Sequence, residues 1–436
     1  MKFYSTNNKS TRVTFHDAVM TGLADDGGLY MPEYIPVLDP SFFLDIKKYS
    51  LAEIGFEIAS KFIEDEISQN DLQDIINDAI NFPAPLIKLN YSLSVLELFH
   101  GPTLAFKDFG ARFIARVMSH FIKDSRKQMN ILVATSGDTG SAVAHGFYGA
   151  EGISVFLLYP KNKVSEIQEK QLTTLDKNIT ALEIDGNFDD CQRMVKAAFV
   201  DKELKPKINL SSANSISIAR LIPQIFYYFE AYKQLPDFDR DVFISIPSGN
   251  LGNLTGGLIA KKMGLPVSKF IAATNFNNVF TEYINSGEFV PRPSVKTFSN
   301  AMDVGNPGNL VRINQLFNDD VSLIREVIFS SSYSDDETVK AIKEVKEKFN
   351  YIIDPHGAVG YIALKDYLKN IPQESYSGIV VETAHPAKFK DIVESATGNE
   401  IEMPEILSEC LKKEKQAVEL PNDFISLKEY LLSKSL

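Results

Sequence analysis

Cysteine is scarce in this sequence, with only Cys191 and Cys410 among 436 residues. Two cysteines so far apart exclude a disulfide-stapled scaffold, and no spacing of cysteine and histidine resembles a zinc site, so no metal site is expected. The sequence also lacks a run of about 18 apolar residues, and its first residues contain no apolar segment typical of a signal peptide. These absences favour a protein of the reducing cytoplasm.

An excess of positive charge is missing as well, because 57 acidic residues outnumber 45 lysines and arginines and give a net charge of −12. Nucleic acids and anionic membranes bind basic surfaces, so neither is expected as a partner. A local basic pocket for a small anion is still compatible with this charge. Hydrophobic residues at 44% and charged residues at 23% are ordinary for a globular protein, and the length suits about two or three domains.

The first part of the chain, residues 1–92, has a helical pattern. A turn-rich segment, "DDGGLYMPEYIPVL", precedes two stretches in which apolar residues recur every three or four positions, "SLAEIGFEIASKFI" and "SQNDLQDIINDAINF". Pro83 and Pro85 close this part. We therefore expect a mostly helical N-terminal region.

From Ile131 onward, short β-rich segments alternate with helical ones. The β-rich segments are "NILVATSG", "ISVFLLYP", "ITALEID", "INLSSAN", "DVFISIPSG", "KFIAATN" and "SGIVVETAHP". The intervening helical segments include "SEIQEKQLTTL", "DDCQRMVKAAFV" and "SISIARLIPQIFYYFEAYKQL". Because the β-rich segments are mostly continuously apolar, both faces of each strand are expected to be covered, as in parallel α/β sheets. The strands suffice for one large sheet or two smaller ones, with "QLPDFDRD" at 234–241 as the crossing between two lobes.

One lysine stands in an unusual place, in "LFHGPTLAFKDFGARF". Lys107 lies between Phe106 and Asp108, directly after a Gly-Pro turn. If apolar neighbours remove water from its ammonium group, the pKa of the lysine falls and its amine becomes a usable nucleophile or base. Taken alone, the segment also fits a lysine without a function.

Three loops follow the ends of predicted strands, which is where parallel α/β sheets bind ligands. Residues 136–141, "SGDTGS", are small enough for backbone amides to approach an anion at a helix start, although capping alone explains any one of them. In residues 248–253, "SGNLGN", the two glycines are expected to adopt unusual φ angles and so form a phosphate cradle. After the last strand, Thr383 and His385 either face a ligand or only cap and turn the chain.

These features together describe a site for pyridoxal 5'-phosphate (PLP). PLP requires a lysine for a Schiff base, a cradle for its phosphate and a partner for its ring nitrogen. The glycine-rich loop is neither a Walker A loop nor a dinucleotide-binding fingerprint.

Several motifs resemble the threonine synthase family of the bacterial and fungal type. They are "HGPTLAFKDFGARF", "ATSGDTGSA", "NSISIARL", "IPSGNLGN", "NAMDVGNP" and "ETAHPAKF", and the resemblance extends to the N-terminal "GLADDGGLYMP". That family belongs to the fold-type II PLP enzymes, the tryptophan synthase β class. The resemblance implies an α/β fold of two open parallel-sheet lobes plus the mostly helical region at 1–92. The smaller lobe, 93–240, would carry the lysine and the SGDTG loop, and the larger lobe, 241–436, would carry the glycine loop.

The resemblance also implies the residues that hold the cofactor. Lys107 would be the catalytic, Schiff-base lysine, and Thr383 would face the pyridine nitrogen. Asp138 takes the place near the PLP hydroxyl where many relatives have asparagine, and an ionised aspartate cannot donate a hydrogen bond. The expected cofactor-binding residues are Lys107, Asp138, Gly249, Asn250, Leu251, Gly252, Asn253 and Thr383.

The implied reaction converts O-phospho-L-homoserine and water to L-threonine and phosphate, by γ-elimination and β-addition of water, as the last step of threonine biosynthesis. The expected substrate-binding residues are Ser136, Gly137, Thr139, Gly140, Ser141 and Arg220. For the substrate phosphate, the sequence does not rank Lys88, Arg112 and Arg220. It assigns no role to His100, His356 or His385 and does not predict the oligomeric state.

Other functions compete with this one. A serine or threonine dehydratase of the same fold shares the cradle but needs no second phosphate site. A related chain that binds ligands without turnover would have lost the lysine or the cradle, and both are present. A sugar-nucleotide protein of the Rossmann type would carry the dinucleotide fingerprint, which is missing.

Overall fold

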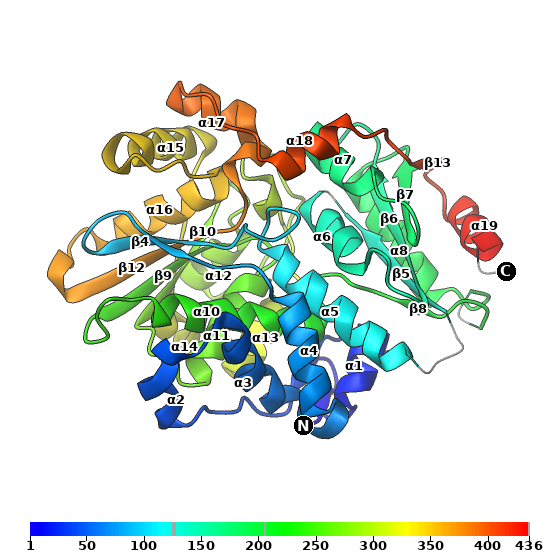
Figure 1. The fold of residues 1–436 in the computed structure, drawn as a ribbon, viewed down its shortest axis with the longest axis horizontal. Helices are drawn as coiled ribbons and strands as arrows, with labels where there is room; N and C mark the ends of the chain where they lie inside the picture. The colour runs from blue at the N-terminus through cyan, green and yellow to red at the C-terminus, as the bar shows by residue number, and fades with distance from the viewer. Residues whose placement is uncertain (124–127, 136, 205, 435–436) are drawn as a thin grey trace.

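The fold was examined in a computed structural model, which describes residues 1–123, 128–135, 137–204 and 206–434 (Figure 1). The α-helices of the N-terminal region are α1 (Phe15–Thr21), α2 (Pro40–Asp45), α3 (Leu51–Ile63) and α4 (Gln69–Ala79). The helices that follow are α5 (Lys107–Ile122), α6 (Asp138–Phe147), α7 (Glu166–Thr173), α8 (Phe188–Val200), α9 (Ile218–Leu221), α10 (Pro223–Lys233), α11 (Gly252–Lys262), α12 (Val279–Ser286), α13 (Leu310–Leu316), α14 (Val321–Val327), α15 (Asp335–Phe349), α16 (Pro355–Leu368), α17 (Lys390–Thr397), α18 (Glu405–Lys412) and α19 (Phe424–Lys434). Short 3₁₀ turns are η1 (Ile46–Lys48), η2 (Glu64–Glu66), η3 (Asn300–Met302), η4 (Gln373–Ser375) and η5 (Pro386–Phe389).

The large sheet has six strands in the order β11-β10-β9-β12-β4-β3. In that order they are Ile328–Ser332, Lys269–Thr274, Asp241–Pro247, Tyr376–Glu382, Leu93–Glu97 and Leu86–Lys88. All pairs are parallel except β3 with β4. Alternate residues of β12 enter different cores: Ile379 and Val381 join one, and Val380 joins the other. Both faces are therefore covered, with α16 packed on β9, β10 and β12 from one side and α11 on β10 from the other (Figure 1).

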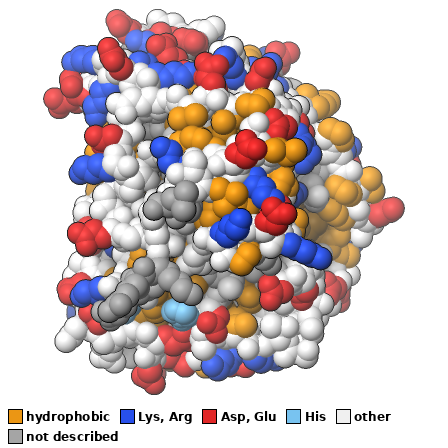
Figure 2. All heavy atoms as spheres, turned by 90° about the vertical axis from the view of Figure 1, so that its right-hand side faces the viewer, with side chains coloured by type: hydrophobic (Ala, Val, Ile, Leu, Met, Phe, Trp, Pro, Cys, Tyr) orange, Lys and Arg blue, Asp and Glu red, His pale blue; other side chains and the backbone are white. Residues whose placement is uncertain are grey.

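The small sheet has five parallel strands in the order β13-β7-β6-β5-β8. They are Val418–Leu420, Ile179–Ile184, Ile153–Pro160, Met129–Ala134 and Leu210–Ser211. Helix α6 packs on one side of this sheet, and α8, with α19 against it, packs on the other. Figure 2 shows the side of the molecule on which the small sheet lies, where acidic and basic side chains are interspersed with apolar ones.

The N-terminal region lies against the helices of both sheets. Its two expected helical stretches are α3 and α4, and α3 begins at a capping box formed by Ser50 and Glu53. Helix α3 packs on α10, and α4 packs on α5. The strands β1 (Phe3–Ser5) and β2 (Tyr30–Pro32) form a small antiparallel pair. The region is mostly helical, as predicted.

All seven predicted β-rich segments contain strands, and the prediction of parallel α/β sheets is confirmed. Strand pairing crosses the expected lobe boundaries at two places. Leu93–Glu97 pairs with β12 in the large sheet, although 93–240 was assigned to the smaller lobe. Val418–Leu420 returns to pair with β7 in the small sheet, although 241–436 was assigned to the larger one. The division of the chain at 92 and 240 stays a prediction.

Among the described residues, the search for bilayer-crossing segments finds no helix with the length and apolar character that a span requires.

We expect Leu427→Ala to lower the free energy of unfolding by about 2–5 kcal/mol, because Leu427 on α19 is fully buried with Met194 and Ala198 of α8. Ile425→Ala is the matched control on the same helix, since Ile425 is 68% exposed and its loss should change stability by less than about 0.5 kcal/mol. Chemical unfolding followed by circular dichroism measures both variants. Equal midpoints for the two variants would show that the C-terminal helix is not part of the small-sheet core.

Candidate active site

Lys107 is the first residue of α5 and lies at the carboxyl edge of the large sheet. The loop before it is held against the end of β12 by backbone hydrogen bonds: Phe106 N donates to Thr383 O at 2.9 Å, and His385 N donates to Leu104 O at 3.1 Å. Because the lysine loop is paired with the segment that contains Thr383, these two candidate residues are brought together as the sequence predicted.

The turn before Lys107 is locked by Asp108. Its carboxylate accepts hydrogen bonds from Thr103 N at 2.8 Å and from Thr103 Oγ1 at 2.7 Å. A Cβ at Gly101 would lie 2.4 Å from Asp108 Oδ2, so only glycine fits there. Burial raises the pKa of Asp108 to about 6, against the opposing effect of these hydrogen bonds. The hydrogen bonds of Asp108 and the close packing at Gly101 therefore fix the conformation of the turn, and with it the direction in which the Lys107 side chain points.

The Lys107 side chain is 16% exposed, and its Nζ lies 3.9 Å from Asp138 Oδ2. Burial lowers the pKa of Lys107 to about 8; the positive charges of Lys388 and Arg220 act in the same direction, and Asp138 opposes them. The apolar neighbours of Lys107 in the sequence predicted this loss of water around its ammonium group. Its amine is therefore neutral in a useful fraction of molecules near neutral pH.

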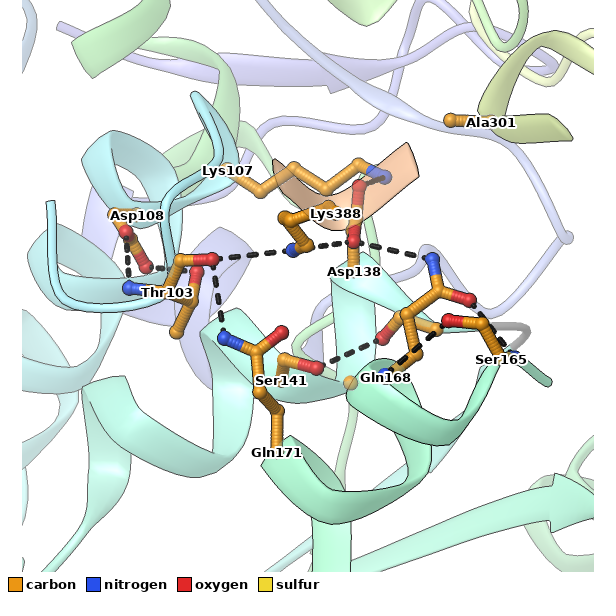
Figure 3. A network of polar contacts seen from close by, with 12 residues as sticks. Thr103, Lys107, Asp108, Asp138, Ser141, Ser165, Gln168, Gln171, Ala301 and Lys388 are labelled. Carbon is orange, nitrogen blue, oxygen red and sulfur yellow. Dashed lines mark hydrogen bonds and ion pairs between the residues drawn. The ribbon is translucent and has the colours of Figure 1, made fainter. Parts of the chain in front are cut away.

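Asp138 begins α6 and is ion-paired with a residue that the sequence analysis missed. Lys388 Nζ lies 2.6 Å from Asp138 Oδ1 and also donates to Thr103 O at 3.1 Å (Figure 3). Gln168 Nε2 donates to the same carboxylate at 3.3 Å. Burial opposes the ionisation of Asp138, but the ammonium groups of Lys388 and Lys107 outweigh it, so the pKa of Asp138 lies well below its usual range.

The loop at 136–141 offers fewer free amides than expected. Thr135 Oγ1 accepts hydrogen bonds from Gly137 N at 3.0 Å and from Gly140 N at 2.8 Å. Ser141 N is bonded to Gly137 O at 3.1 Å. Within the described part of the chain, only the amides of Asp138 and Thr139 are left without an acceptor in this loop. Ser136 lies outside the described residues.

Close packing leaves no room for a side chain at the two glycines of this loop. A Cβ at Gly140 would lie 2.4 Å from Thr135 Cγ2, and Gly137 has φ 143° with its missing Cβ directed at the Gln168 side chain. Of the loop residues expected to bind an anion, Asp138 and Thr139 are therefore the ones whose backbone amides have no acceptor among the described residues.

The glycine loop at 248–253 does not have the predicted backbone. The expectation that its glycines adopt unusual φ angles is wrong, because neither Gly249 nor Gly252 has a positive φ, and the left-handed residue is Leu251 with φ 60°. Gly249 is required by close packing instead, since a Cβ there would lie 2.8 Å from Ala301 O. A Cβ at Gly252 would make only ordinary van der Waals contacts, the nearest with Asn309 Nδ2 at 3.5 Å, so no clash requires glycine there.

The start of α11 nevertheless fits a phosphate group. Asn253 Oδ1 accepts hydrogen bonds from the hydroxyls of Tyr227 at 2.7 Å and Tyr228 at 2.5 Å. These two donors fix the amide so that Asn253 Nδ2 is a buried donor without a partner among the described residues. A buried donor at a helix N-terminus, next to a glycine, is an arrangement that suits an anion.

Asn250 and Thr383 have different surroundings. Asn250 Nδ2 donates to Ser215 Oγ at 2.7 Å and its Oδ1 accepts from Gly308 N, so its side chain holds neighbouring loops in place. Thr383 is 7% exposed, and its hydroxyl has no partner within the described residues. The hydroxyl is therefore available to a ligand, whereas the Asn250 side chain is not.

The structure ranks the three candidate cations. Lys88 is exposed on β3, and Arg112 Nε is bonded to Ala79 O of the N-terminal region at 2.9 Å. Arg220 is 2% exposed, and its charge is among those that lower the pKa of Lys107. Its Nη1 donates to Ala213 O at 2.8 Å, while its buried Nε has no partner in the described part of the chain. Burial lowers the pKa of Arg220 to about 10.

The histidines left unassigned by the sequence make structural contacts. His356 Nε2 accepts from Ala301 N at 3.1 Å and so supports the segment that packs on Gly249. His385 Nδ1 accepts from Ala387 N at 3.1 Å and caps η5. His100 Nε2 lies 2.7 Å from Glu97 Oε2.

Comparison with known proteins gives consistent matches over the whole chain. The family models described as "Threonine synthase N terminus", "Pyridoxal-phosphate dependent enzyme" and "Threonine synthase, C-terminal" match residues 2–80, 80–382 and 357–431. A threonine synthase of Haemophilus influenzae is 46% identical over 433 residues, which cover 99% of this chain and 100% of that protein.

Solved structures agree with these matches. The crystal structure of threonine synthase from Escherichia coli has a TM-score of 0.93 at 43% identity and covers 100% of both chains. The PLP-bound threonine synthase from Brucella melitensis has a TM-score of 0.93 at 34% identity and covers 100% of this chain and 99% of that one.

We expect Gly252→Val to fold normally and to weaken PLP binding about ten- to a hundredfold, because a Cβ there meets no clash but adds bulk at the helix start, next to the Asn253 donor that has no partner among the described residues. Gly249→Val should lower both the melting temperature and PLP affinity, since its Cβ collides with Ala301 O. PLP titration by absorbance and thermal unfolding separate the two effects. A folded Gly252→Val variant with unchanged PLP affinity would contradict the phosphate cradle.

Proposed function

This chain belongs to the threonine synthase family of PLP-dependent enzymes, and from this premise we propose that its substrates are O-phospho-L-homoserine and water. Its activity is that of a threonine synthase, a lyase acting on a phosphate-bearing substrate, and its cofactor is pyridoxal 5'-phosphate. The observation that carries the proposal is one water-depleted lysine, Lys107, whose pKa is lowered in part by the nearby Arg220, a buried cation whose Nε has no partner among the described residues.

The cofactor is assigned to residues of both sheets. In this proposal Lys107 binds its carbonyl carbon, the glycine loop with Asn253 Nδ2 holds its phosphate, and the Thr383 hydroxyl faces its ring nitrogen. A neutral hydroxyl does not force that nitrogen to carry a proton, as a carboxylate would. When bound, PLP supplies an electron sink for negative charge that develops on the substrate carbons.

Lys107 would have a second role as a base. Its amine would stay tethered beside the substrate α-carbon, so Lys107 Nζ would be the natural acceptor of the α-proton. Its lowered pKa of about 8 suits this role, because an ordinary lysine would be almost entirely protonated at neutral pH.

The substrate brings a carboxylate and a phosphate in addition to the phosphate of PLP. Arg220 supports the proposal as a cation whose Nε has no partner among the described residues. The amides of Asp138 and Thr139 at the start of α6, for which the described residues provide no acceptor, support a second anion subsite. Gly137, Gly140 and Ser141 act in this proposal by shaping the loop.

The proposal includes a cytoplasmic location and a small-molecule substrate, with neither nucleic acid nor a membrane as a partner. The two cysteines support a reducing compartment, because both are free thiols in the structure. A dehydratase of the same fold is the alternative, and the test below separates the two activities.

We expect Lys107→Ala to lose the lysine-bound PLP absorbance and to lower turnover by at least about 10²-fold, because both the attachment point and the base are removed. Lys123→Ala is the control, since Lys123 is an exposed lysine just beyond the other end of α5. Borohydride reduction followed by peptide mass spectrometry locates the attached cofactor. A reduced PLP adduct in Lys107→Ala would mean that another lysine binds PLP.

We also expect O-phosphohomoserine to yield threonine and equimolar phosphate, with homoserine almost inert, because the phosphate is both a binding handle and the leaving group. Serine and threonine should yield little keto acid. Purified protein with PLP is incubated with each compound, and phosphate, threonine and keto acid are assayed. Keto acid from threonine without phosphate release from O-phosphohomoserine would make the chain a dehydratase instead.

A further inference from the structure

Three charged side chains from different elements meet in one buried place (Figure 3). Lys388 comes from η5, Asp138 from α6 and Lys107 from α5. The Asp138 carboxylate lies 2.6 Å from Lys388 Nζ through Oδ1 and 3.9 Å from Lys107 Nζ through Oδ2. The Lys388 side chain has no exposed surface, which is rare for a lysine and needs a physical reason.

We propose that Lys388 is a positioning residue that occupies Asp138 and thereby leaves the amine of Lys107 free to lose its proton and react. The proposal rests on the assignment of Lys107 as the cofactor lysine. The proposal concerns the protonation state of Lys107 before the cofactor or the substrate binds.

The reason lies in the balance of charge in a site without water. Two ammonium groups and one carboxylate carry a net charge of +1, and burial disfavours such an excess. The neutral arrangement has one lysine without its proton. Lys388 is the lysine tied to the carboxylate, because it lies closer to Asp138 and donates a further hydrogen bond to Thr103 O, so the excess charge bears on Lys107.

Removal of Lys388 would reverse the effect of burial on the protonation of Lys107. Lys107 and Asp138 would then form a neutral ion pair by themselves. Burial would favour that pair, and Lys107 would be held as a cation that cannot act as a nucleophile. The direction of the known influences agrees, since Lys388 lowers the pKa of Lys107 and Asp138 raises it.

Other charged groups around the three do not reverse this balance. Arg220 on α9 lowers the pKa of Lys107, but its charge is offset by Asp108, the acid that acts on it. His356 on α16 accepts a hydrogen bond at Nε2 from Ala301 N, and its electrostatic influence falls on Asp138. His145 on α6 is neutral near pH 7, because burial lowers its pKa to about 4. Arg112 on α5 acts on Asp108 and donates a hydrogen bond to Ala79 O of the N-terminal region.

The test measures the protonation of Lys107 in the full-length chain after PLP has been removed. Trace acetylation with acetic anhydride from pH 6 to 10, normalised to the plateau at high pH, gives the pKa of Lys107 by peptide mass spectrometry. In Lys388→Met we expect this pKa to rise by about one unit, so that acetylation at pH 7 slows about tenfold. Lys388→Arg should restore most of the original value.

The control is Lys390→Met. Lys390 lies two positions further on, and its side chain is paired with Glu394 and Glu400 at the surface. This variant should leave the pKa of Lys107 and the rate of PLP attachment unchanged. An equal rise in both methionine variants would overturn the proposal.

The route through Asp138 is tested by a double-variant cycle. Asp138→Asn alone should lower the pKa of Lys107, and adding Lys388→Met in that background should raise it by less than half of the change seen with Asp138 present. Equal changes in both backgrounds would show that Lys388 does not act through Asp138. If Lys388→Met does not fold, an unchanged pKa of Lys107 in Asp138→Asn overturns the proposal by itself.

Reconstitution of the holoenzyme gives a second readout. The rate at which added PLP forms a borohydride-reducible bond should shift toward higher pH in Lys388→Met. A purely structural tie would instead lower the melting temperature and leave both pH profiles in place. The acetylation result does not involve PLP, so it stands or falls independently of the cofactor assignment.

Discussion

The site depends on one short piece of backbone pairing, between residues 104–106 and 383–385. Strands β4 and β12 are neighbours in the large sheet, and the pairing continues beyond their ends through Leu98 N to Glu382 O and then Phe106 N to Thr383 O. This continuation turns the chain from the large sheet into α5, which packs against α6 on the small sheet. Lys107, at the start of α5, therefore stands where the two sheets meet, and the other site residues are arranged around it.

Much of this fold was predictable because buried parallel strands are continuously apolar. Strand β11 was missed, because "IFSSS" looks like a turn; its serines are tolerated inside the sheet since Ser330 Oγ donates to Ala272 O at 2.9 Å. Strand β13 was missed for another reason. It is only three residues long, and nothing in a local pattern shows that the chain returns to the small sheet after α18.

The site was predictable to the extent that its signals are local. Lys107 was found from its apolar neighbours, and the same signal was present at Lys388, which lies between Ala387 and Phe389 after a proline. It was not recognised because the partner of Lys388 is on a different element, and no spacing relates the two. The backbone conformation of the glycine loop could not be predicted from the sequence either. Close packing on Ala301 requires glycine at position 249, and Leu251 adopts the left-handed conformation.

The place of β12 in the large sheet has a consequence for synthesis of the chain. It is the last of the six strands to be made, yet it lies in the interior of the sheet between β9 and β4. At ordinary rates of translation, the interval between β9 and β12 lasts on the order of ten seconds. During that time β3 and β4 have no sheet to join, and the lysine loop lacks its backbone partner at residues 383–385. A nascent chain therefore cannot assemble the site until most of it has left the ribosome, and an interrupted chain yields no half-built enzyme that could capture the cofactor.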